Sequence, residues 1–378
     1  MRDLAAGSPM ESAPVIRTSV LTGEGLDGLR EALRERASAV HEKERDDIFR
    51  MPVDRVFTRS GIGTIATGTV WSGEVAKGDT LVLEPSGRRV RVREVHSFDD
   101  AVPRAGAGQR TAIALHGARV EDVHIGNQVI EPEMLEPSSM LDVSVEMSAI
   151  QGSKLTNRQR IRFHHAAGEV MARAVLLDSE ELGPGQAGLV QLRLEKKSVA
   201  RRGDRFVIRS YSPMRVIGGG KVLDPVPSKA KRLEERRNSF LGAMEGGGSE
   251  EVAKALVKRQ GVEGLTSGRM VEFGFAPKDG ESALGELVRS GEALAVGGRF
   301  ISADAAEKME AKLSEAIERH IDSNPLAWGI EREVLRERIT AGDGPLFERL
   351  LEKGKNEGRL FLRGGLVRAG SGELDLGE

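Results

Sequence analysis

The sequence contains no cysteine, a single tyrosine and two tryptophans, and aromatic residues make up only 4% of it. Without cysteine, disulfide bonds, thiolate catalysis and cysteine-ligated zinc are all excluded. No apolar stretch approaches the roughly 20 residues of a membrane-spanning helix, and the N-terminus has no apolar core of the secretory kind. We therefore expect a cytoplasmic protein with no membrane partner.

The sequence strings of a GTP-hydrolysing domain are also missing. A phosphate loop needs Gly-x-x-x-x-Gly-Lys-Ser/Thr, because its backbone N–H groups cup the phosphates while the lysine reaches them. No such string occurs, and neither do the Asp-x-x-Gly and Asn-Lys-x-Asp strings. Gly218-Gly-Gly-Lys has the wrong spacing and no hydroxyl, so we predict a tight turn between strands there.

No arrangement for covalent catalysis or metal binding stands out either. His164 and His165 are adjacent, so on a strand their side chains point to opposite faces. This pattern favours one core and one surface histidine over a shared metal. We therefore expect no catalytic residue, metal site or cofactor in this chain.

The residues that are present describe a soluble protein of several domains. A length of 378 residues suggests two to four domains. The net charge of −2 is uneven, because residues 151–232 hold 17 basic against 7 acidic side chains, a net charge of +10. Such a segment suits a polyanionic partner. A solvated basic face is the alternative interpretation.

The hydrophobic pattern changes twice along the chain. Residues 13–20 form an apolar run of strand length, followed by a glycine turn and an amphipathic pattern that predicts a helix over 26–40, the closing unit of an α/β domain. From Phe49 the period becomes two, with glycine turns between short runs. This predicts two tandem closed β-barrels, over 46–132 and 133–228, joined near 131–138.

An internal repeat marks the C-terminal part. Gly291-Glu-Ala-Leu-Ala-Val-Gly-Gly matches Gly358-Arg-Leu-Phe-Leu-Arg-Gly-Gly at an offset of 67 residues, and an amphipathic helical pattern precedes each copy. A helix followed by a glycine-tipped hairpin is the end of a winged-helix module. We predict α+β winged helices over 229–302 and 303–370, and a tail over 371–378.

Three ordered strings carry a family resemblance. Phe49-Arg-Met-Pro-Val-Asp-Arg-Val-Phe, Gly61-Ile-Gly-Thr-Ile-Ala-Thr-Gly-Thr-Val and Gly73-Glu-Val-Ala-Lys-Gly-Asp-Thr-Leu resemble the second domain of translational GTPases. Within that superfamily, Ala107-Gly-Gln-Arg, Arg162-Phe-His-His, Gly203-Asp-Arg-Phe-Val-Ile-Arg-Ser-Tyr-Ser-Pro and Ile217-Gly-Gly-Gly-Lys-Val-Leu-Asp-Pro resemble the selenocysteine-specific elongation factors. The likeness extends over essentially the whole chain.

The resemblance implies a function and a set of partners. Members of that family use GTP and Mg²⁺ to deliver selenocysteinyl-tRNA to the ribosome at a UGA codon that an mRNA hairpin marks. In this sequence only Ser19, Val20 and Leu21 match the last guanine-side loop, and two winged helices stand where bacterial members carry four. We therefore expect a truncated, monomeric, tRNA-binding trunk that lacks most of the GTPase domain and the hairpin-binding winged helices. We also expect residues 1–45 to be poorly packed or to make a substitute contact with the first barrel.

The resemblance also implies an aminoacyl pocket at Asp54, Arg55 and Arg110. A selenol is largely ionised at neutral pH and a serine hydroxyl is not, so a cationic pocket separates the cargo from its serine precursor. Asp54 is expected to orient Arg55 while both guanidinium groups face the selenolate. From the residues alone, Asp54-Arg55 is better explained by a surface ion pair, and it is the resemblance that favours a function for it.

The family resemblance also implies a role for the basic segment, residues 151–232. The resemblance implies that it tracks tRNA phosphates, through Arg158, Arg160, Arg162, His164, Arg173 and Arg209. Alternation places Arg158, Arg160 and Arg162 on one strand face, where a simple core strand would not tolerate them. Tyr211 either stacks on RNA or anchors the barrel.

Other functions remain as alternatives. A winged-helix DNA-binding regulator is one, although Ser282-Ala-Leu-Gly-Glu-Leu-Val-Arg and Pro345-Leu-Phe-Glu-Arg-Leu-Leu-Glu-Lys lack a groove face rich in Arg, Asn and Gln. Another translational GTPase of the elongation or initiation factor superfamily is a second. An active GTPase is a third, which GTP binding by this chain would establish.

Overall fold

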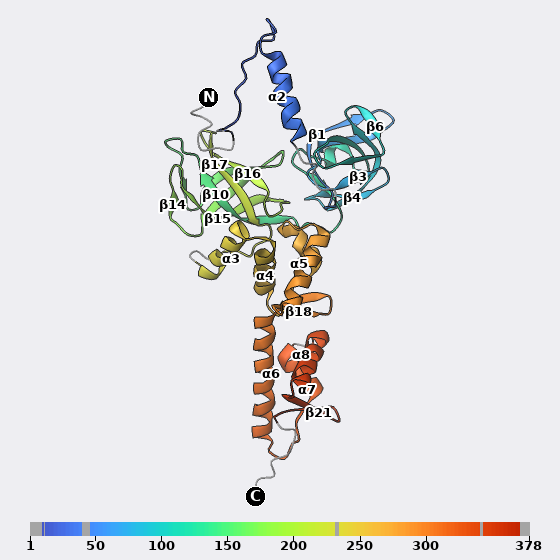
Figure 1. Cartoon of the computed structure of the whole chain (residues 1–378), viewed down its shortest axis with the longest axis vertical. Coiled ribbons are helices and arrows are strands. Elements are labelled where there is room, and N and C mark those ends of the chain that lie inside the picture. The colour runs from blue at the N-terminus through green and yellow to red at the C-terminus, as the bar shows by residue number, and fades with distance from the viewer. Residues whose placement is uncertain (1–9, 11, 40–45, 231–233, 341–342, 371–378) are drawn as a thin grey trace. The chain divides into compact units, whose positions relative to one another are not determined.

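The computed structural model describes residues 10, 12–39, 46–230, 234–340 and 343–370. The chain divides into two compact units, Met1–Glu44 and Arg45–Glu378. Figure 1 labels the elements, in colours that run from blue at the N-terminus to red at the C-terminus. None of the described helices is long and apolar enough to cross a membrane.

The described residues of the N-terminal unit contain one helix, α2 (Leu26–Ser38), which begins after Gly25 in a left-handed conformation (φ 71°). The predicted strand over 15–19 is wrong, because these residues form no strand. A single strand without hydrogen-bonding neighbours is not stable in water. The expected poor packing is confirmed for the described residues of this unit, since none of them is buried. Val40, the end of the predicted helix, lies outside the described residues.

The first predicted barrel is confirmed. Six antiparallel strands follow each other in the order β4-β9-β1-β2-β8-β5, and β4 also pairs with β5, which closes the ring. Their bounds are β1 (Arg50–Arg59), β2 (Gly63–Thr69), β4 (Thr80–Glu84), β5 (Arg88–Ser97), β8 (Arg110–His116) and β9 (Gln128–Ile130). The strands β6 (Asp100–Val102), β3 (Glu74–Ala76) and β7 (Arg104–Gly106) and the short helix η1 (Val120–Asp122) lie outside this ring. Alternate residues such as Met51, Val53 and Ile113 fill the interior, as the period-two pattern predicts.

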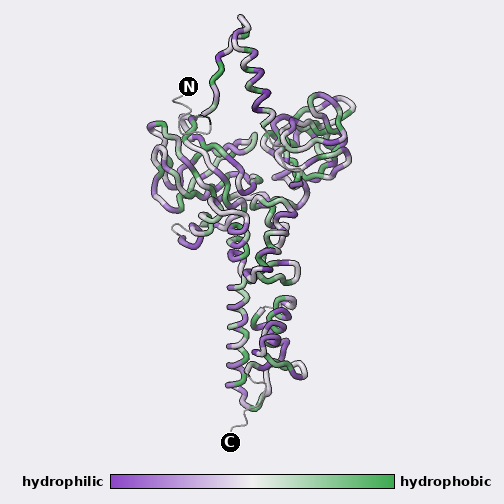
Figure 2. Tube along the Cα trace, in the orientation of Figure 1, coloured by the Kyte–Doolittle hydropathy of each residue, from purple (hydrophilic) through white to green (hydrophobic). Residues whose placement is uncertain are grey.

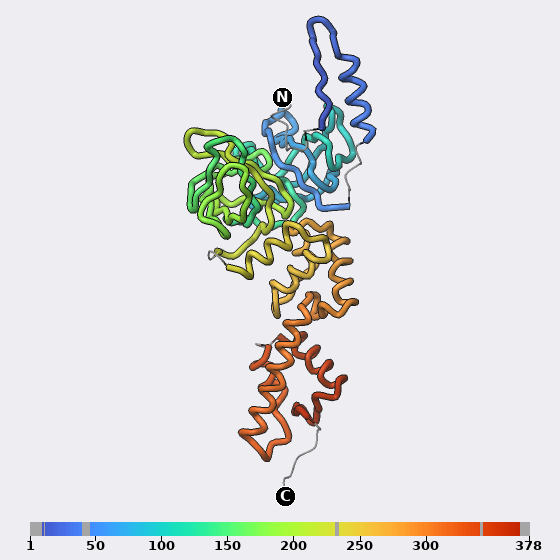
Figure 3. The backbone as a smooth tube through the Cα atoms, turned by 60° about the vertical axis from the view of Figure 1, so that its left-hand side comes forward, coloured from blue at the N-terminus to red at the C-terminus, as the bar shows by residue number. Residues whose placement is uncertain are grey.

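The second barrel is closed as well, in the order β10-β15-β13-β12-β16-β17. Figure 3 shows its strands, in green, curling into a ring. Their bounds are β10 (Ser138–Met147), β12 (Gln159–His165), β13 (Gly168–Leu176), β15 (Ala187–Ser198), β16 (Arg205–Ser210) and β17 (Val216–Asp224), with a small ladder of β11 (Leu155–Thr156) and β14 (Glu181–Leu182) beside them. Ile161, Phe163 and Leu192 are among the side chains of its core.

The predicted tight turn at Gly218-Gly-Gly-Lys is wrong. Gly218, Gly219 and Gly220 lie inside strand β17, between β10 and β16. A Cβ on Gly220 would lie 1.8 Å from the carbonyl oxygen of Ser144, and one on Gly218 would lie 2.6 Å from that of Glu146. The glycines are therefore needed because neighbouring backbones approach closely, and not because the chain turns.

Two winged-helix modules follow. The first contains α3 (Glu235–Gly246), α4 (Ser249–Gln260), η2 (Ser267–Phe273), α5 (Pro277–Arg289), β18 (Ala293–Val296) and β19 (Arg299–Ser302). The second contains α6 (Ala303–Ser323), β20 (Ile330–Glu331), α7 (Arg332–Thr340), α8 (Gly344–Asn356), β21 (Leu360–Arg363) and β22 (Leu366–Ala369). Figure 2 shows purple and green residues alternating along α6, as expected of an amphipathic helix.

The repeat found in the sequence is confirmed as a structural repeat. Gly297 and Gly298 tip the β18–β19 hairpin with φ of 54° and 79°. Gly364 and Gly365 tip the β21–β22 hairpin with φ of 57° and 83°. Two consecutive positive φ values are the requirement of a type I′ hairpin turn, which explains why both copies keep the glycine pair.

Buried ion pairs hold the two barrels together. Arg50 of the first barrel donates from Nη2 to Asp204 Oδ2 of the second at 2.7 Å, and His165 Nε2 lies 3.1 Å from the same oxygen. The guanidinium of Arg50 also lies 5.2 Å from the ring centroid of Trp71, which contacts His165 edge-on. The pocket and the arginine face described below are therefore parts of one packed unit.

The first winged helix packs directly on the second barrel. Leu177 and Leu223 of the barrel share a hydrophobic cluster with Leu241 and Met244 of α3. Arg201 donates to the carbonyl oxygen of Val271 at 2.6 Å, which joins the β15–β16 connection to η2. This junction buries charged groups as well as apolar ones.

Glu272 in this junction is expected to make stability depend on pH. Burial raises the pKa of Glu272 to about 7, from an ordinary value near 4.5. Between these two values the unfolded carboxyl ionises while the folded one stays protonated, so this group costs stability as the pH rises. Glu272→Gln is therefore expected to raise the free energy of unfolding by about 3 kcal/mol at pH 8 and by almost nothing at pH 4.

Urea denaturation of both proteins at pH 4 and pH 8 tests this expectation. Glu245→Gln, at an exposed position of α3, is the matched control and should change stability at neither pH. An equal effect of Glu272→Gln at both pH values would show that folding does not raise the pKa of this carboxyl.

Candidate functional site

A bulge in the first barrel shapes the candidate pocket. The register between β1 and β2 shifts between Val53 and Arg55, so Asp54 is the extra residue of β1. A bulge lets consecutive side chains depart from strict alternation. Asp54 can therefore reach across β2 toward Arg110 of β8. Arg55 lines a cavity that Arg110 also lines.

The structure brings Asp54 and Arg110 together. Arg110 holds the Asp54 carboxylate with both terminal nitrogens, and its Nη2 donates to Oδ1 at 3.0 Å. Thr67, on β2 between them, donates from Oγ1 to the same Oδ1 at 2.9 Å. The expectation that Asp54 orients Arg55 is thus wrong. Asp54 orients Arg110, and the reason is that the bulge turns the carboxylate toward the neighbouring strands.

Arg55 and Arg110 line one cavity of about 450 Å³, which we call the cationic pocket. Its other walls include Phe57, Ile65 and Phe98. Phe98 is 82% exposed and, with Asp99, takes a positive φ in the β5–β6 turn. An exposed aromatic ring in an uncommon backbone conformation is typical of a binding surface.

The pocket keeps a net positive charge. The hydrogen bond from Arg110 lowers the pKa of the Asp54 carboxyl, which is therefore ionised at neutral pH. The guanidinium groups of Arg55, Arg59 and Arg110 against the carboxylates of Asp54 and Asp99 leave about one positive charge. His96 also lines the pocket, and its Nε2 lies 3.2 Å from Glu94 Oε2. The arrangement suits a small monoanionic group.

The second barrel carries a continuous row of arginines on its outer surface. Arg209 of β16 lies directly opposite Arg162 of β12, and Arg160 of β12 lies opposite Arg173 of β13. Arg173 in turn lies opposite Arg193 of β15. We call these five residues the arginine face. Like charges directly opposite each other on a sheet destabilise it, so structure alone gives no reason for this row.

Among the described residues, two carboxylates form ion pairs with the arginine face. Glu195 accepts from Arg160 at 2.8 and 2.9 Å, and Glu169 accepts from Arg162. The Nε atoms of Arg162 and Arg209 are buried and have no hydrogen-bond partner among the described residues. The ring centroid of Tyr211 lies 4.9 Å from the guanidinium of Arg160. Tyr211 therefore stacks against the arginines and lies at the surface, 50% exposed.

Comparison with known proteins agrees with the barrels and the winged helices. Residues 141–229 match the selenocysteine-specific elongation factor β-barrel domain, residues 63–130 match elongation factor Tu domain 2, and residues 315–368 match the winged helix of elongation factor SelB. The selenocysteine-specific elongation factor of Desulfomicrobium baculatum is 32% identical over 374 residues, or 96% of this chain. The chain belongs to the family of selenocysteine-specific elongation factors.

Other members of the family support the same fold. The factor of Escherichia coli K12 is 26% identical over 348 residues, which is 92% of this chain. The crystal structure of a bacterial selenocysteine-specific elongation factor, EF-Sec, covers 92% of this chain with a TM-score of 0.73 and 22% identity. This chain spans between about half and three-fifths of each of these three proteins, covering 58%, 54% and 54% of them.

The structure also shows where the two adjacent histidines and Arg158 lie. His165 is buried and His164 lies on the outer face beside Arg162, so one core and one surface histidine are confirmed. Burial lowers the pKa of His164, and the neighbouring arginines add to this effect. Arg158 is exposed, but it lies in a turn before β12 with φ 63° and not on the strand face as predicted. Because Arg158 lies in the tight turn between β11 and β12, it is not part of the arginine face.

The predicted guanine-side loop forms an exposed turn in the N-terminal unit. Ser19 accepts from the backbone N–H of Gly23 at 2.9 Å, and its own N–H donates to Glu24 at 3.0 Å. Val20 and Leu21 are 87% and 99% exposed. Two hydrogen bonds thus close the turn at its base, and both of its apolar side chains point to solvent.

Sequence reasoning missed Arg193, Thr67 and Phe98. The alternation of Leu192, Arg193 and Leu194 was a readable signal that Arg193 points outward. Thr67 and Phe98 gave no such signal, because their positions follow from the bulge at Asp54 and from the turn after β5.

Proposed function

We propose that this chain binds selenocysteinyl-tRNA as the cargo-holding part of a selenocysteine-specific elongation factor that delivers it to the ribosome at UGA codons. The aminoacyl group occupies the cationic pocket. The arginine face contacts the phosphates of the acceptor and T arms.

The observation that carries this proposal is the Asp54–Arg110 pair beside Arg55. A guanidinium clamped by a carboxylate is pre-organised, so little side-chain entropy is lost when it meets an anion. The pair itself is neutral, and Arg55 and Arg59 against Asp99 leave about one positive charge in a pocket whose walls include apolar side chains. A selenolate satisfies that charge, whereas a neutral serine hydroxyl of the same reach leaves it without a partner.

The arginine face supports the tRNA part of the proposal. Phosphate oxygens accept hydrogen bonds from guanidinium groups in the planar, forked geometry that carboxylates also use. Glu169 and Glu195 hold two of these arginines in place in the free protein, and a phosphate backbone would then compete for the same donors. The arginine face consists of five residues, so substituting two of them removes a large part of its charge.

Arg160→Ala with Arg162→Ala is expected to weaken tRNA binding about tenfold at 0.1 M salt and to lower the slope of log Kd against log salt by about 1.5. Each arginine is expected to contact one phosphate. Each contact that is lost means that about one counterion fewer is released on binding, which lowers the salt slope by about 0.7–0.9. Fluorescence anisotropy with labelled tRNA at several salt concentrations measures both quantities. Arg88→Ala with Arg104→Ala, which breaks two exposed ion pairs of the first barrel, is the matched control. An unchanged slope would remove the arginine face from the proposal.

Duplex DNA is a poorer partner for the winged helices. The exposed positions of α5 include Asp279, Glu281 and Glu286, which would face the phosphates of a DNA groove. Their negative charge opposes such a contact.

A further inference from the structure

Two hollows meet where the second barrel, the first winged helix and α6 come together. The larger has a volume of about 660 Å³ and lies between the end of β17, α3 and α4. The smaller, of about 230 Å³, lies between the end of α4 and the first turns of α6. Arg236 and Lys258 line both hollows, so the two form one continuous groove. We call it the winged-helix groove.

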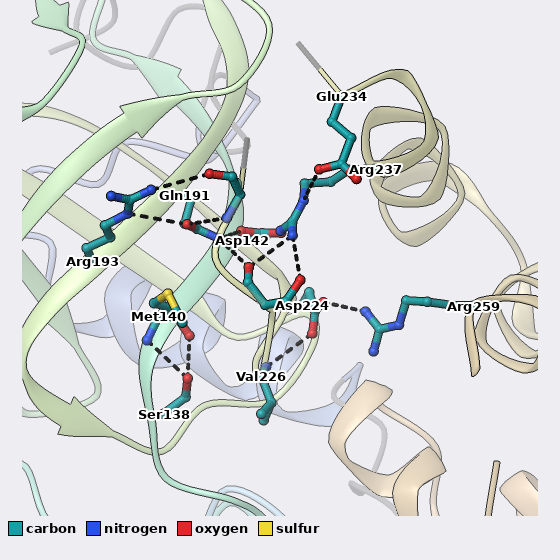
Figure 4. A network of polar contacts seen from close by, with 12 residues as sticks. Ser138, Met140, Asp142, Gln191, Arg193, Asp224, Val226, Glu234, Arg237 and Arg259 are labelled. Atoms are coloured by element: carbon teal, nitrogen blue, oxygen red, sulfur yellow. Dashed lines mark hydrogen bonds and ion pairs between the residues drawn. The ribbon is translucent and has the colours of Figure 1, made fainter. Parts of the chain in front are cut away.

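Basic side chains outnumber acidic ones in this groove. Seven lining residues are Lys or Arg and four are Asp or Glu. The buried acids are already paired, as Figure 4 shows: Asp142 with Arg237, and Asp224 with Arg259. Gln191 also donates to Asp142 at 2.9 Å. These two pairs fix the wall of the groove and neutralise its two buried acids, whereas Glu234 and Asp304 lie farther, at 3.7 and 3.8 Å, from Arg237 and Lys258.

The cations that remain point to an external anion. Arg236, Lys308 and Lys312 are exposed and form no ion pair or hydrogen bond with any described side chain. Lys308 and Lys312 lie four residues apart on the same face of α6, where two like charges cost stability. Lys258 has only a distant partner, with 3.8 Å between its Nζ and Asp304 Oδ2.

The groove also lies next to the arginine face. Arg193, the last member of that row, donates to Gln191 and to the carbonyl oxygen of Ala230, both at 3.4 Å. Gln191 and Arg193 therefore connect the arginine row of β15 to the network around Asp142 (Figure 4). Gln191 and Asp142 are buried, so this connection is an internal hydrogen-bond network that joins the arginine row to the wall of the groove.

We propose that the winged-helix groove binds the phosphate backbone of the same RNA that the arginine face contacts, at a point farther from the aminoacyl end. This inference rests on the proposed function and extends it to the first winged helix and α6. Arg236, Lys308 and Lys312 would contact phosphate oxygens, which carry no sequence information, whereas Arg237 and Arg259 are already held by carboxylates. The contact is therefore independent of nucleotide sequence.

The test replaces the three unpaired cations together. Arg236→Ala, Lys308→Ala and Lys312→Ala should weaken binding of deacylated tRNA roughly tenfold at 0.1 M salt and lower the salt slope by about two. Binding of a 16-base-pair RNA duplex without an aminoacyl end should weaken as well. A variant with Lys77→Ala, Lys355→Ala and Arg363→Ala loses the same charge at exposed positions outside the groove and should bind like the unmodified chain.

The outcomes separate this inference from the proposed function. Unchanged tRNA binding by the groove variant, with weaker binding by the Arg160 and Arg162 variant, would overturn the groove and leave the function in place. Unchanged binding by both variants would overturn both. If the groove variant loses binding to poly-L-glutamate but not to either RNA, an acidic protein is the partner and the RNA assignment is wrong.

Discussion

Arg110→Ala is expected to lower the preference for selenocysteinyl-tRNA over seryl-tRNA about thirtyfold. One guanidinium about 4 Å from a selenolate contributes roughly 4 kcal/mol at an effective dielectric constant near 20, before desolvation is subtracted. If about half of that remains, the ratio of the two dissociation constants changes about thirtyfold. The seryl form gains nothing from the charge, so its Kd should hardly move. Both Kd values are measured by competition binding with the unmodified chain and the variant.

Two further variants show whether the effect belongs to the Asp54–Arg110 pair. Asp54→Asn keeps Arg110 but removes its anchor, so part of the preference should survive. Arg104→Ala removes an arginine of the same barrel that pairs with Glu74 and does not line the pocket, so it should leave the preference intact. If Arg110→Ala leaves the relative affinities of the two tRNAs unchanged, the pocket is assigned to the wrong residues.

Asp204→Ala is expected to lower the free energy of unfolding by about 3–5 kcal/mol. Asp204 is the only described carboxylate within ion-pair distance of the buried guanidinium of Arg50, whose side chain is 3% exposed. Removing it leaves a buried positive charge without a partner between the two barrels. It also removes the acceptor for His165 and for the backbone N–H of Arg201, at 3.1 and 2.8 Å. Urea denaturation at pH 7 measures the loss.

The same pair has a pH signature. Burial opposes ionisation of Asp204, but Arg50 and His165 outweigh it and hold the pKa of this carboxyl below its usual value near 4. A lowered folded pKa stabilises the protein at pH values above the unfolded one, and this contribution is lost as the pH falls. The cost of Asp204→Ala should therefore shrink in acid.

A double-mutant cycle completes the test. Arg50→Met with Asp204→Leu should be less destabilising than the sum of the two single changes, because neither charge is then left alone. Equal costs of Asp204→Ala at pH 7 and at pH 3 would contradict the ion-pair explanation.

The fold could be predicted from the sequence where one strong pattern decided it. Alternation with period two and regularly spaced glycines predicted both barrels, and the glycine pairs 67 residues apart predicted both winged-helix hairpins. The run Gly218-Gly-Gly was misread because glycine serves two purposes. It permits turns, and it also permits the close approach of strands, and only the position of Ser144 on β10 decides between them.

The candidate site was harder to predict from the sequence than the fold, for a physical reason. Asp54 and Arg110 lie 56 residues apart, and their contact depends on a bulge that shifts the register by one residue. Nothing in the local sequence distinguishes that bulge from regular alternation, which would point Asp54 and Arg55 to opposite faces of the sheet. Alternation alone predicts that Arg193 points outward. That it extends the arginine row becomes clear only when β13 and β15 are aligned, because Arg193 then lies opposite Arg173.

The central claim is that this chain recognises its cargo by charge. The most direct measurement compares one tRNA carrying selenocysteine, cysteine or serine, with the Kd of each form for the unmodified chain at pH 7. The selenol is mostly ionised at that pH, whereas a thiol with a pKa near 8.5 is not, although the three side chains are similar in shape. The account predicts that the selenocysteinyl form binds about thirtyfold more tightly than the seryl form, with the cysteinyl form close to the seryl one. Equal affinity for all three forms, or no binding of any, would contradict it.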